Sequence, residues 1–259
     1  QQKLDSEIYI LSKKIVENKV QPDALTEEEL RYSATLTPLL SEKLEIYKAA
    51  VLNTRKWQAF NDLGVTYFEM AQKTHSNNTR EKLLREAITN LTYASHRNPT
   101  AGMFYNLASA HHIKGNLIEA QRSYEYAIKL GGPVPVLQQV FADKAALEIE
   151  MGLLDEALTS LTYAGQGYQV LMNKGLAYIL KGYYEEAAGI YEEALALKPN
   201  DPLAHYSLAI IGARTSQEDT VTRNLREATR RDRSLIAKAI DDPEFRSYVK
   251  LPAFREAIK

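Results

Sequence analysis

Several residue types and patterns are missing from this chain of 259 residues. It has no cysteine, which excludes disulfide bonds, thiolate nucleophiles and zinc–thiolate sites. It has no excess of either charge, since 32 Lys and Arg residues balance 33 Asp and Glu residues. No overall field therefore attracts nucleic acid or an anionic membrane. The longest apolar runs, such as 175–180 and 208–213, are far shorter than the roughly 20 residues that span a bilayer. We expect no nucleic-acid partner and no membrane insertion.

Signatures of catalysis and of cofactor binding are missing as well. The five histidines include no pair at the spacing of a metal site, such as His-x-x-x-His. The sequence contains no Gly-x-Gly-x-x-Gly, no phosphate loop and no Gly-x-Ser-x-Gly. We therefore predict a protein that is not an enzyme, with no catalytic residue, no metal site and no cofactor. An enzyme with an unfamiliar site on a helical scaffold stays open as an alternative.

What the sequence does contain is an internal repeat. Three stretches match: Gly-Asn-Leu-Ile-Glu-Ala at 115–120, Gly-Leu-Leu-Asp-Glu-Ala at 152–157 and Gly-Tyr-Tyr-Glu-Glu-Ala at 182–187. Each has a small residue seven positions before its glycine, a second alanine seven positions after its last alanine, and a large residue midway between the alanines. Small residues allow two helices to approach closely, and a large residue fills the gap beside them.

This pattern resembles the tetratricopeptide repeat (TPR), a unit of about 34 residues that forms two antiparallel helices. Five units fit the pattern within 57–233, at 57–100, 101–137, 138–167, 168–201 and 202–233. The resemblance implies an all-α fold, a right-handed α-solenoid of antiparallel helix pairs (a TPR superhelix) with helical caps at both ends. The alternative is a generic helical bundle rich in alanine, which five repeated landmarks argue against.

The units differ in length, and the differences predict local irregularities. The extra residues of the first unit lie around 73–80, as an exposed loop or a lengthened helix end. Gly165-Gln166-Gly167 shortens the junction after the third unit. Gly115, Gly152 and Gly182 are expected to adopt the left-handed conformation that ends a first helix.

The two ends of the chain lie outside the five units. Residues 1–56 are predicted as an N-terminal helical segment containing at most one degenerate repeat, with a capping box at Thr26 to Glu29. Residues 234–259 are predicted as C-terminal capping helices. Asp242-Pro-Glu-Phe245 and Leu251-Pro-Ala-Phe254 each place a proline at the first position of a helix and an aromatic residue just inside it.

The resemblance implies a concave groove lined by the first helix of each unit. The predicted peptide-groove residues are Asn61, Phe68, Tyr105, Asn106, His112, Met172, Asn173, Tyr206 and Arg214. An asparagine amide can both donate to and accept from a peptide backbone, although asparagine is also simply frequent at this position in the family. The groove has no lysine at the positions that hold a carboxylate clamp, which argues against the TPR class that binds chaperone C-termini.

One charge cluster stands out on the sequence: Arg223, Arg226, Arg230, Arg231 and Arg233, with Glu227 and Asp232 among them. The first interpretation is a solvated outer helix with charge pairs one turn apart. The second is a docking patch for an acidic partner.

A fainter resemblance concerns the last part of the chain. The stretch from Ile211 to Phe245 resembles the end of TPR regions in envelope proteins of Bacteroidota-type bacteria, which often precede an OmpA-like domain. A start at Gln1-Gln2 would fit cleavage by a signal peptidase. This implies a periplasmic or outer-membrane-associated location, with a cytoplasmic location as the alternative.

These observations predict a non-enzymatic protein–protein interaction scaffold that binds a peptide or protein segment in its concave groove. The alternative is an architectural or oligomerisation segment of a larger bacterial envelope (OmpA-like) protein. Formation of a homo-oligomer stays open in both cases.

Overall fold

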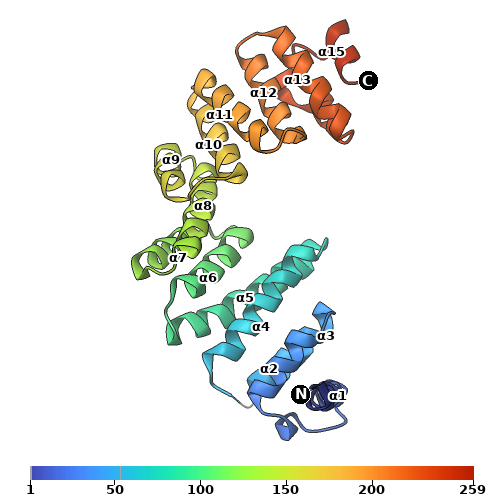
Figure 1. The fold of residues 1–259 in the computed structure, drawn as a ribbon, viewed down its shortest axis with the longest axis vertical. Coiled ribbons are helices and arrows are strands. Elements are labelled where there is room, and N and C mark those ends of the chain that lie inside the picture. The colour runs from blue at the N-terminus through green and yellow to red at the C-terminus, as the bar shows by residue number, and fades with distance from the viewer. Residues whose placement is uncertain (1, 53) are drawn as a thin grey trace. The chain divides into compact units, whose positions relative to one another are not determined.

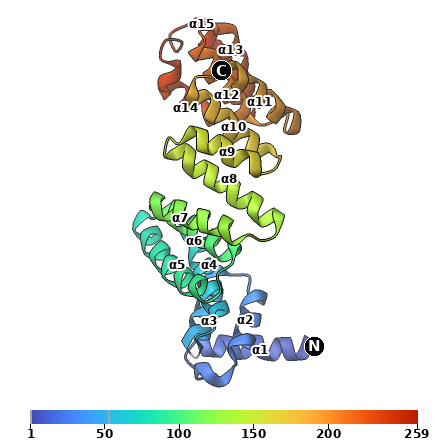
Figure 2. The same cartoon turned by 90° about the vertical axis from the view of Figure 1, so that its left-hand side faces the viewer.

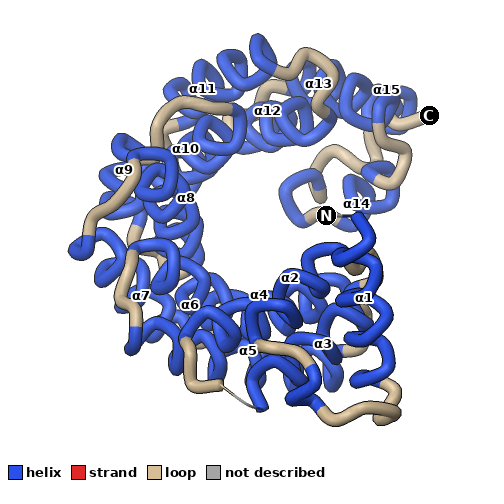
Figure 3. The backbone as a smooth tube through the Cα atoms, turned by 60° about the horizontal axis from the view of Figure 1, so that its bottom comes forward, coloured by secondary structure: helices blue, strands red, loops and turns tan. Residues whose placement is uncertain are grey.

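A computed structural model describes residues 2–52 and 54–259, and these residues form helices and turns with no strand (Figure 3). The helices are α1 (Gln2–Val16), η1 (Pro22–Ala24), α2 (Glu27–Leu36), α3 (Leu40–Leu52), α4 (Trp57–Lys73), α5 (Asn77–Arg97), α6 (Ala101–Lys114), α7 (Leu117–Leu130), α8 (Val134–Glu150), α9 (Leu154–Tyr163), α10 (Tyr168–Lys181), α11 (Tyr184–Leu197), α12 (Pro202–Arg214), α13 (Glu218–Arg231), α14 (Leu235–Asp241), η2 (Pro243–Phe245) and α15 (Pro252–Ala257). The predicted all-α class is confirmed.

The chain forms two compact units, which we describe separately. The N-terminal unit extends to Val140 and holds α1 to α7, while the C-terminal unit begins at Phe141 and holds α9 to α15. In each unit, helices that follow one another in the sequence pack side by side, as in the pairs α4–α5 and α12–α13 (Figures 1 and 2). The helix pair is therefore the building block of both units.

The repeat landmarks form the contacts within the pairs. The second-helix alanines Ala87, Ala94, Ala120, Ala127, Ala187 and Ala194 are all fully buried. The small residue of a first helix meets the large residue of its partner: a Cβ atom on Gly175 would lie 2.7 Å from the ring of Tyr191, and one on Gly64 would lie 2.8 Å from Leu91. Real side chains do not approach that closely, so each helix crossing depends on glycine.

The predicted turn glycines adopt the expected conformation. The φ angles of Gly115, Gly152 and Gly182 are 85°, 76° and 80°, in the left-handed region. Around 73–80, the lengthened-helix interpretation is correct, because only three residues separate α4 from α5. Arg80 Nη2 donates to the carbonyl of Thr74 at 2.8 Å, so this carbonyl at the C-terminal end of α4 has a hydrogen-bond partner.

The N-terminal segment packs together with α4 in one apolar cluster. The predicted capping box opens α2: Glu29 N–H donates to Thr26 Oγ1 at 3.2 Å, and Thr26 N–H donates to Glu29 Oε2 at 2.8 Å. Helix α1 lies against α2 and α3, where Ser12 and Ser33 share a buried hydrogen bond of 2.6 Å. Through α3 and α2, this segment packs against α4, the first helix of the pairs that follow.

The C-terminal segment covers the last helix pair, as predicted. Phe245 and Phe254 are fully buried and pack in one apolar cluster with Tyr206, Val221 and Leu225 of α12 and α13. We call residues 235–258 the C-terminal cap. Its aromatic side chains supply the apolar surface that a following repeat would supply in a longer array.

Helix α9 departs from the regular pattern. It has 10 residues, whereas α7, α11 and α13 have 14 each. A buried polar cluster lies between α8 and α9: the Glu148 side chain is 1% exposed, pairs with Lys144, and accepts from Ser160 Oγ at 2.6 Å. These hydrogen bonds join α9 to α8 in place of part of the apolar contact.

Candidate functional site

In the N-terminal unit, two predicted groove residues gather around one tyrosine. Tyr105 and His112 of α6 both face the Tyr124 ring of α7, at centroid distances of 6.3 and 6.4 Å. Ser109, one helical turn after Tyr105, lies 3.5 Å from the Tyr124 hydroxyl. Tyr105 and His112 are half-buried. Each of these two side chains therefore packs against α7 and is also partly exposed on the surface of α6.

The other predicted residues of this unit lie on α4 and α6. Asn61, Phe68 and Asn106 are half-buried. Asn61 Oδ1 is buried and has no hydrogen-bond partner among the residues that the structure describes. Next to it, Asp62 Oδ2 accepts from Arg31 Nε at 2.6 Å, which links α4 to α2. Desolvation is the largest single influence on the pKa of Arg31 and lowers it. The hydrogen bond to Asp62 and the charges of Asp62 and Glu27 together outweigh desolvation, so the pKa of Arg31 is raised.

In the C-terminal unit, an exposed face on α10 combines amides with leucines. Leu176 is 40% exposed and Leu180 is 46% exposed. Asn173 lies on the same side of the helix and accepts from Gln169 Nε2 at 3.3 Å through its Oδ1. Positions spaced by three and four residues share one side of a helix. We call Gln169, Asn173, Leu176 and Leu180 the α10 face.

Met172, also predicted to line the groove, is half-buried. Its side chain packs against the cluster around Ile179, Tyr191 and Leu208. Its carbonyl accepts from the Tyr191 hydroxyl at 3.5 Å. Met172 therefore supports the helix pair more than it forms exposed surface.

The two predicted groove residues of α12 are engaged by the C-terminal cap. Tyr206 is only 3% exposed; its hydroxyl donates to Asp242 Oδ2 at 2.7 Å, and its ring meets Phe245 edge-on at 5.6 Å. Burial, followed by the hydrogen bond to Asp242, raises the pKa of Tyr206. Arg214 forms a bidentate pair with Glu244, at 3.0 and 2.5 Å. The prediction of open groove surface is therefore corrected at Tyr206, whereas Arg214 stays exposed at the surface while it pairs with Glu244.

Two functional features were missing from the sequence prediction. Leu180, which the sequence prediction did not include, is exposed, whereas its neighbour Ile179 is 4% exposed. The pair between Arg31 and Asp62 places a charged residue of α2 beside the predicted groove residues of α4. The exposure of Leu180 depends on how α10 packs against α11 and α12, and the charge pair depends on the packing of α2.

The arginine cluster of α13 fits its first interpretation. Glu227 pairs with Arg230 at 3.2 Å and with Arg231, and these charge pairs lie three and four residues apart on an outer helix. Hydrogen bonding to Arg231 is the main cause of the lowered pKa of Glu227. Arg223 and Arg226 are exposed on the same helix.

Within 2–52 and 54–259, no three His, Cys, Asp or Glu side chains are grouped as metal ligands. In the same part of the chain, no helix has the length and apolar character needed to cross a bilayer.

The fold and its landmarks define a class of helical repeat protein, and two family models identify the repeat. Residues 101–130 match the model described as "Tetratricopeptide repeat", and residues 175–214 match the model described as "TPR repeat". These matches support assignment of the repeats to the TPR family, whose members generally mediate protein–protein interactions. No curated protein sequence matches the chain.

Solved structures share the fold at low sequence identity. A tetratricopeptide repeat protein from Parabacteroides merdae matches with a TM-score of 0.64 and 14% identity, over 90% of this chain and 99% of that one. A chain of the APC/C hetero-tetramer Cut9-Hcn1 matches with a TM-score of 0.61 and 16% identity, over 98% of this chain. This chain spans only 46% of that one. YrrB, described as a TPR protein with an unusual peptide-binding site, matches with a TM-score of 0.56 and 16% identity, over 74% and 96%.

Proposed function

We propose that this chain is a non-enzymatic interaction scaffold whose α10 face binds a peptide segment of a partner protein. The observation that carries the proposal is the pair of exposed leucines, Leu176 and Leu180, on the same side of α10 as the Asn173 amide. Leucine side chains offer apolar area, and the amide offers one donor and one acceptor to a peptide backbone. A ligand of low net charge suits this face, since its four residues are all uncharged.

The proposal is supported by two further facts. The TPR family generally mediates protein–protein interactions, and both family-model matches lie in regions that include predicted groove helices. Tyr206 of α12 is buried beneath the C-terminal cap and Arg214 is paired with Glu244, whereas the exposed leucines of the α10 face are not engaged by the cap. Binding is therefore expected to depend on α10 more than on α12.

The test begins with selection of binding peptides from a displayed random-peptide library against the intact chain. A selected peptide is then titrated by calorimetry against the wild type and the double variant Asn173→Ala, Leu176→Ala. The variant is expected to bind more weakly by about 1–3 kcal/mol. Its stability should change by less than about 0.5 kcal/mol for each substitution, because both side chains lie at the surface.

The matched control is Arg226→Ala, an exposed residue of outer helix α13. It should leave the affinity unchanged. Loss of binding in Arg226→Ala together with full binding in the α10 variant would contradict the proposal and would favour the acidic-partner interpretation of the arginine cluster. The location in a bacterial envelope stays a proposal, which localisation of the tagged, full-length gene product would test.

A further inference from the structure

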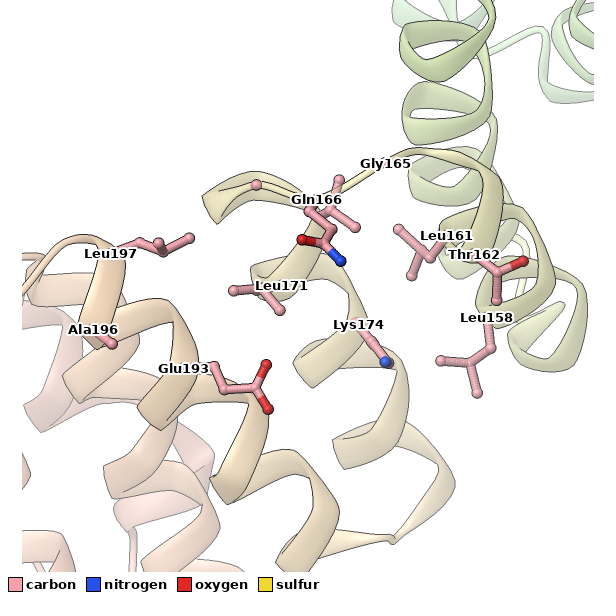
Figure 4. A pocket seen from close by; sticks show the side chains of 12 residues that line it. Leu158, Leu161, Thr162, Gly165, Gln166, Leu171, Lys174, Glu193, Ala196 and Leu197 are labelled. Carbon is pink, nitrogen blue, oxygen red and sulfur yellow. The ribbon is translucent and has the colours of Figure 1, made fainter. Parts of the chain in front are cut away.

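A pocket opens in the C-terminal unit on the side of the second helices, away from the α10 face. Its volume is about 730 Å³, and its walls come from α9, α10 and α11. Apolar side chains line most of it: Leu158, Leu161, Val170, Leu171 and Leu197. Figure 4 shows Leu158 and Leu161 on one wall and Leu197 on the opposite wall, with Leu171 between them. We call this cavity the α9–α11 pocket.

The pocket exists because α9 ends early. After the landmark alanine of the next second helix, Ala194, the chain continues with Leu195, which packs against Leu208 and Ile211 of the following first helix. After Ala164, at the end of α9, the sequence is Gly165-Gln166-Gly167. The turn that would cover α10 is therefore missing, along with a counterpart of Leu195. One helical turn of four residues adds about 6 Å of helix.

The pocket also contains charges that a purely apolar occupant would leave unsatisfied. Lys174, at the position that Leu208 holds in the next repeat, is half-buried and makes no hydrogen bond or ion pair within the described residues. Glu193 of α11 also lines the pocket (Figure 4). A partly desolvated ammonium group is stabilised by an acidic partner. The pocket thus selects an occupant with apolar side chains, a carboxylate directed at Lys174, and a cation tolerated beside Glu193.

We propose that the α9–α11 pocket binds a short acidic-apolar segment of a partner protein, about one to two helical turns long, which supplies the missing turn after α9. The leucine-type side chains of this segment contact Val170 and Leu171, and its carboxylate pairs with Lys174. The site is separate from the α10 face and does not depend on the function proposed for that face.

The probe for this site is an eight-residue peptide with the sequence of residues 192–199, Glu-Glu-Ala-Leu-Ala-Leu-Lys-Pro, acetylated and amidated. It contains the turn that completes the junction after α11. The peptide is titrated into the intact chain carrying isotope-labelled methyl groups on Leu and Val, with NMR detection. The methyl signals of Val170, Leu171 and Leu197 are expected to shift and to saturate at submillimolar peptide, while those of Leu176 and Leu180 stay in place.

Two protein variants and one altered peptide test the charge pairing. Lys174→Glu should weaken binding by about tenfold or more. The matched control Lys129→Glu, at an exposed site on α7, should leave it unchanged. A peptide with both glutamates replaced by lysine should bind the Lys174→Glu chain better than it binds the wild type. That rescue would not occur if Lys174→Glu merely disturbed folding.

Three results would overturn the proposal. The first is an absence of methyl shifts up to millimolar peptide. The second is a set of shifts confined to Leu176 and Leu180, which would assign the peptide to the α10 face and leave the pocket empty. The third is a shift of the pocket methyls when the protein alone is concentrated, with a matching rise in mass by sedimentation, which would identify a second copy of the chain as the occupant.

Discussion

The contact between Gly175 and Tyr191 allows a sharp test of how the helix pairs are built. In an ordinary helix, replacing an interior glycine with alanine stabilises the protein by about 0.5–1 kcal/mol, because glycine has more backbone freedom to lose. At Gly175 the added methyl group would lie 2.7 Å from two atoms of the Tyr191 ring, which is 2% exposed and surrounded by packed neighbours. Gly175→Ala should therefore destabilise the protein.

The magnitude follows from two opposing terms. Overpacking a tight core site destabilises a protein by about 1–3 kcal/mol. The higher helix propensity of alanine stabilises it by about 0.5–1 kcal/mol. The expected net loss for Gly175→Ala is about 1–2 kcal/mol. Gly175→Leu adds a longer side chain at the same crossing and should cost roughly 2–4 kcal/mol.

Gly189 provides a matched control on the partner helix. It lies within α11 and is exposed. A Cβ atom added at this position would have no neighbouring atom within 4 Å among the described residues outside its own helix turn. Gly189→Ala should therefore raise the free energy of unfolding by about 0.5–1 kcal/mol. Urea denaturation followed by circular dichroism measures both variants against the wild type. In a Tyr191→Leu background, where the ring is gone, Gly175→Ala should become neutral or stabilising. If Gly175→Ala stabilises the wild type as Gly189→Ala does, the close approach of α10 to Tyr191 is refuted.

Three further outcomes are expected. Deletion of residues 234–259 exposes the faces of α12 and α13 that Phe245 and Phe254 cover, so the truncated chain should aggregate on gel filtration; a monomer that unfolds as cooperatively as the parent would contradict the capping role. Lys144→Met leaves the buried Glu148 carboxylate unpaired and should cost about 3–5 kcal/mol in urea denaturation, whereas Lys144→Met with Glu148→Leu should cost much less; equal losses would argue against a buried charge pair. Burial raises the pKa of Tyr47 from 10.0 to about 12, so the unfolded chain ionises first and stability falls between these pH values by up to about 2–3 kcal/mol. Tyr47→Phe should lose less stability over this interval, and a wild type and variant that fall in parallel would exclude the contribution of Tyr47.

The helix pairs could be predicted from the sequence because their contacts are local. Gly175 and Tyr191 lie within one repeat, and Gly64 and Leu91 make the equivalent contact within the first unit despite its longer interval, so one pattern of small and large residues specifies each crossing. The capping box at Thr26 and the turn at Gly182 are also local, since each depends on a few adjacent residues. The sequence could indicate that 234–259 forms a cap, because proline and aromatic positions mark its short helices.

The candidate site was harder to predict because exposure depends on contacts between distant segments. Tyr206 and Asp242 lie 36 residues apart, and nothing in the repeat pattern indicates that the cap reaches this groove position. Ile179 and Leu180 are adjacent apolar residues near the end of α10, and only the packing of α11 and α12 decides which one is buried. The glycines after α9 indicated a short junction, but the pocket and the unpaired Lys174 appear only once α9, α10 and α11 are placed together.

The early end of α9 has a mechanical consequence. In a stack of repeats, stability is approximately the sum of the repeats and of the interfaces between neighbours, so the array separates first where an interface is weakest. The α9–α10 interface lacks the helical turn that follows Ala194 in the next repeat. Helix α9 is held to α8 partly by the hydrogen bonds of Glu148. Within the C-terminal unit, the α9–α10 interface is therefore one place where the stack can open under a pulling force or mild denaturant. An occupant of the pocket would contact both α9 and α10. Its reversible binding would therefore raise the force at which these two helices separate.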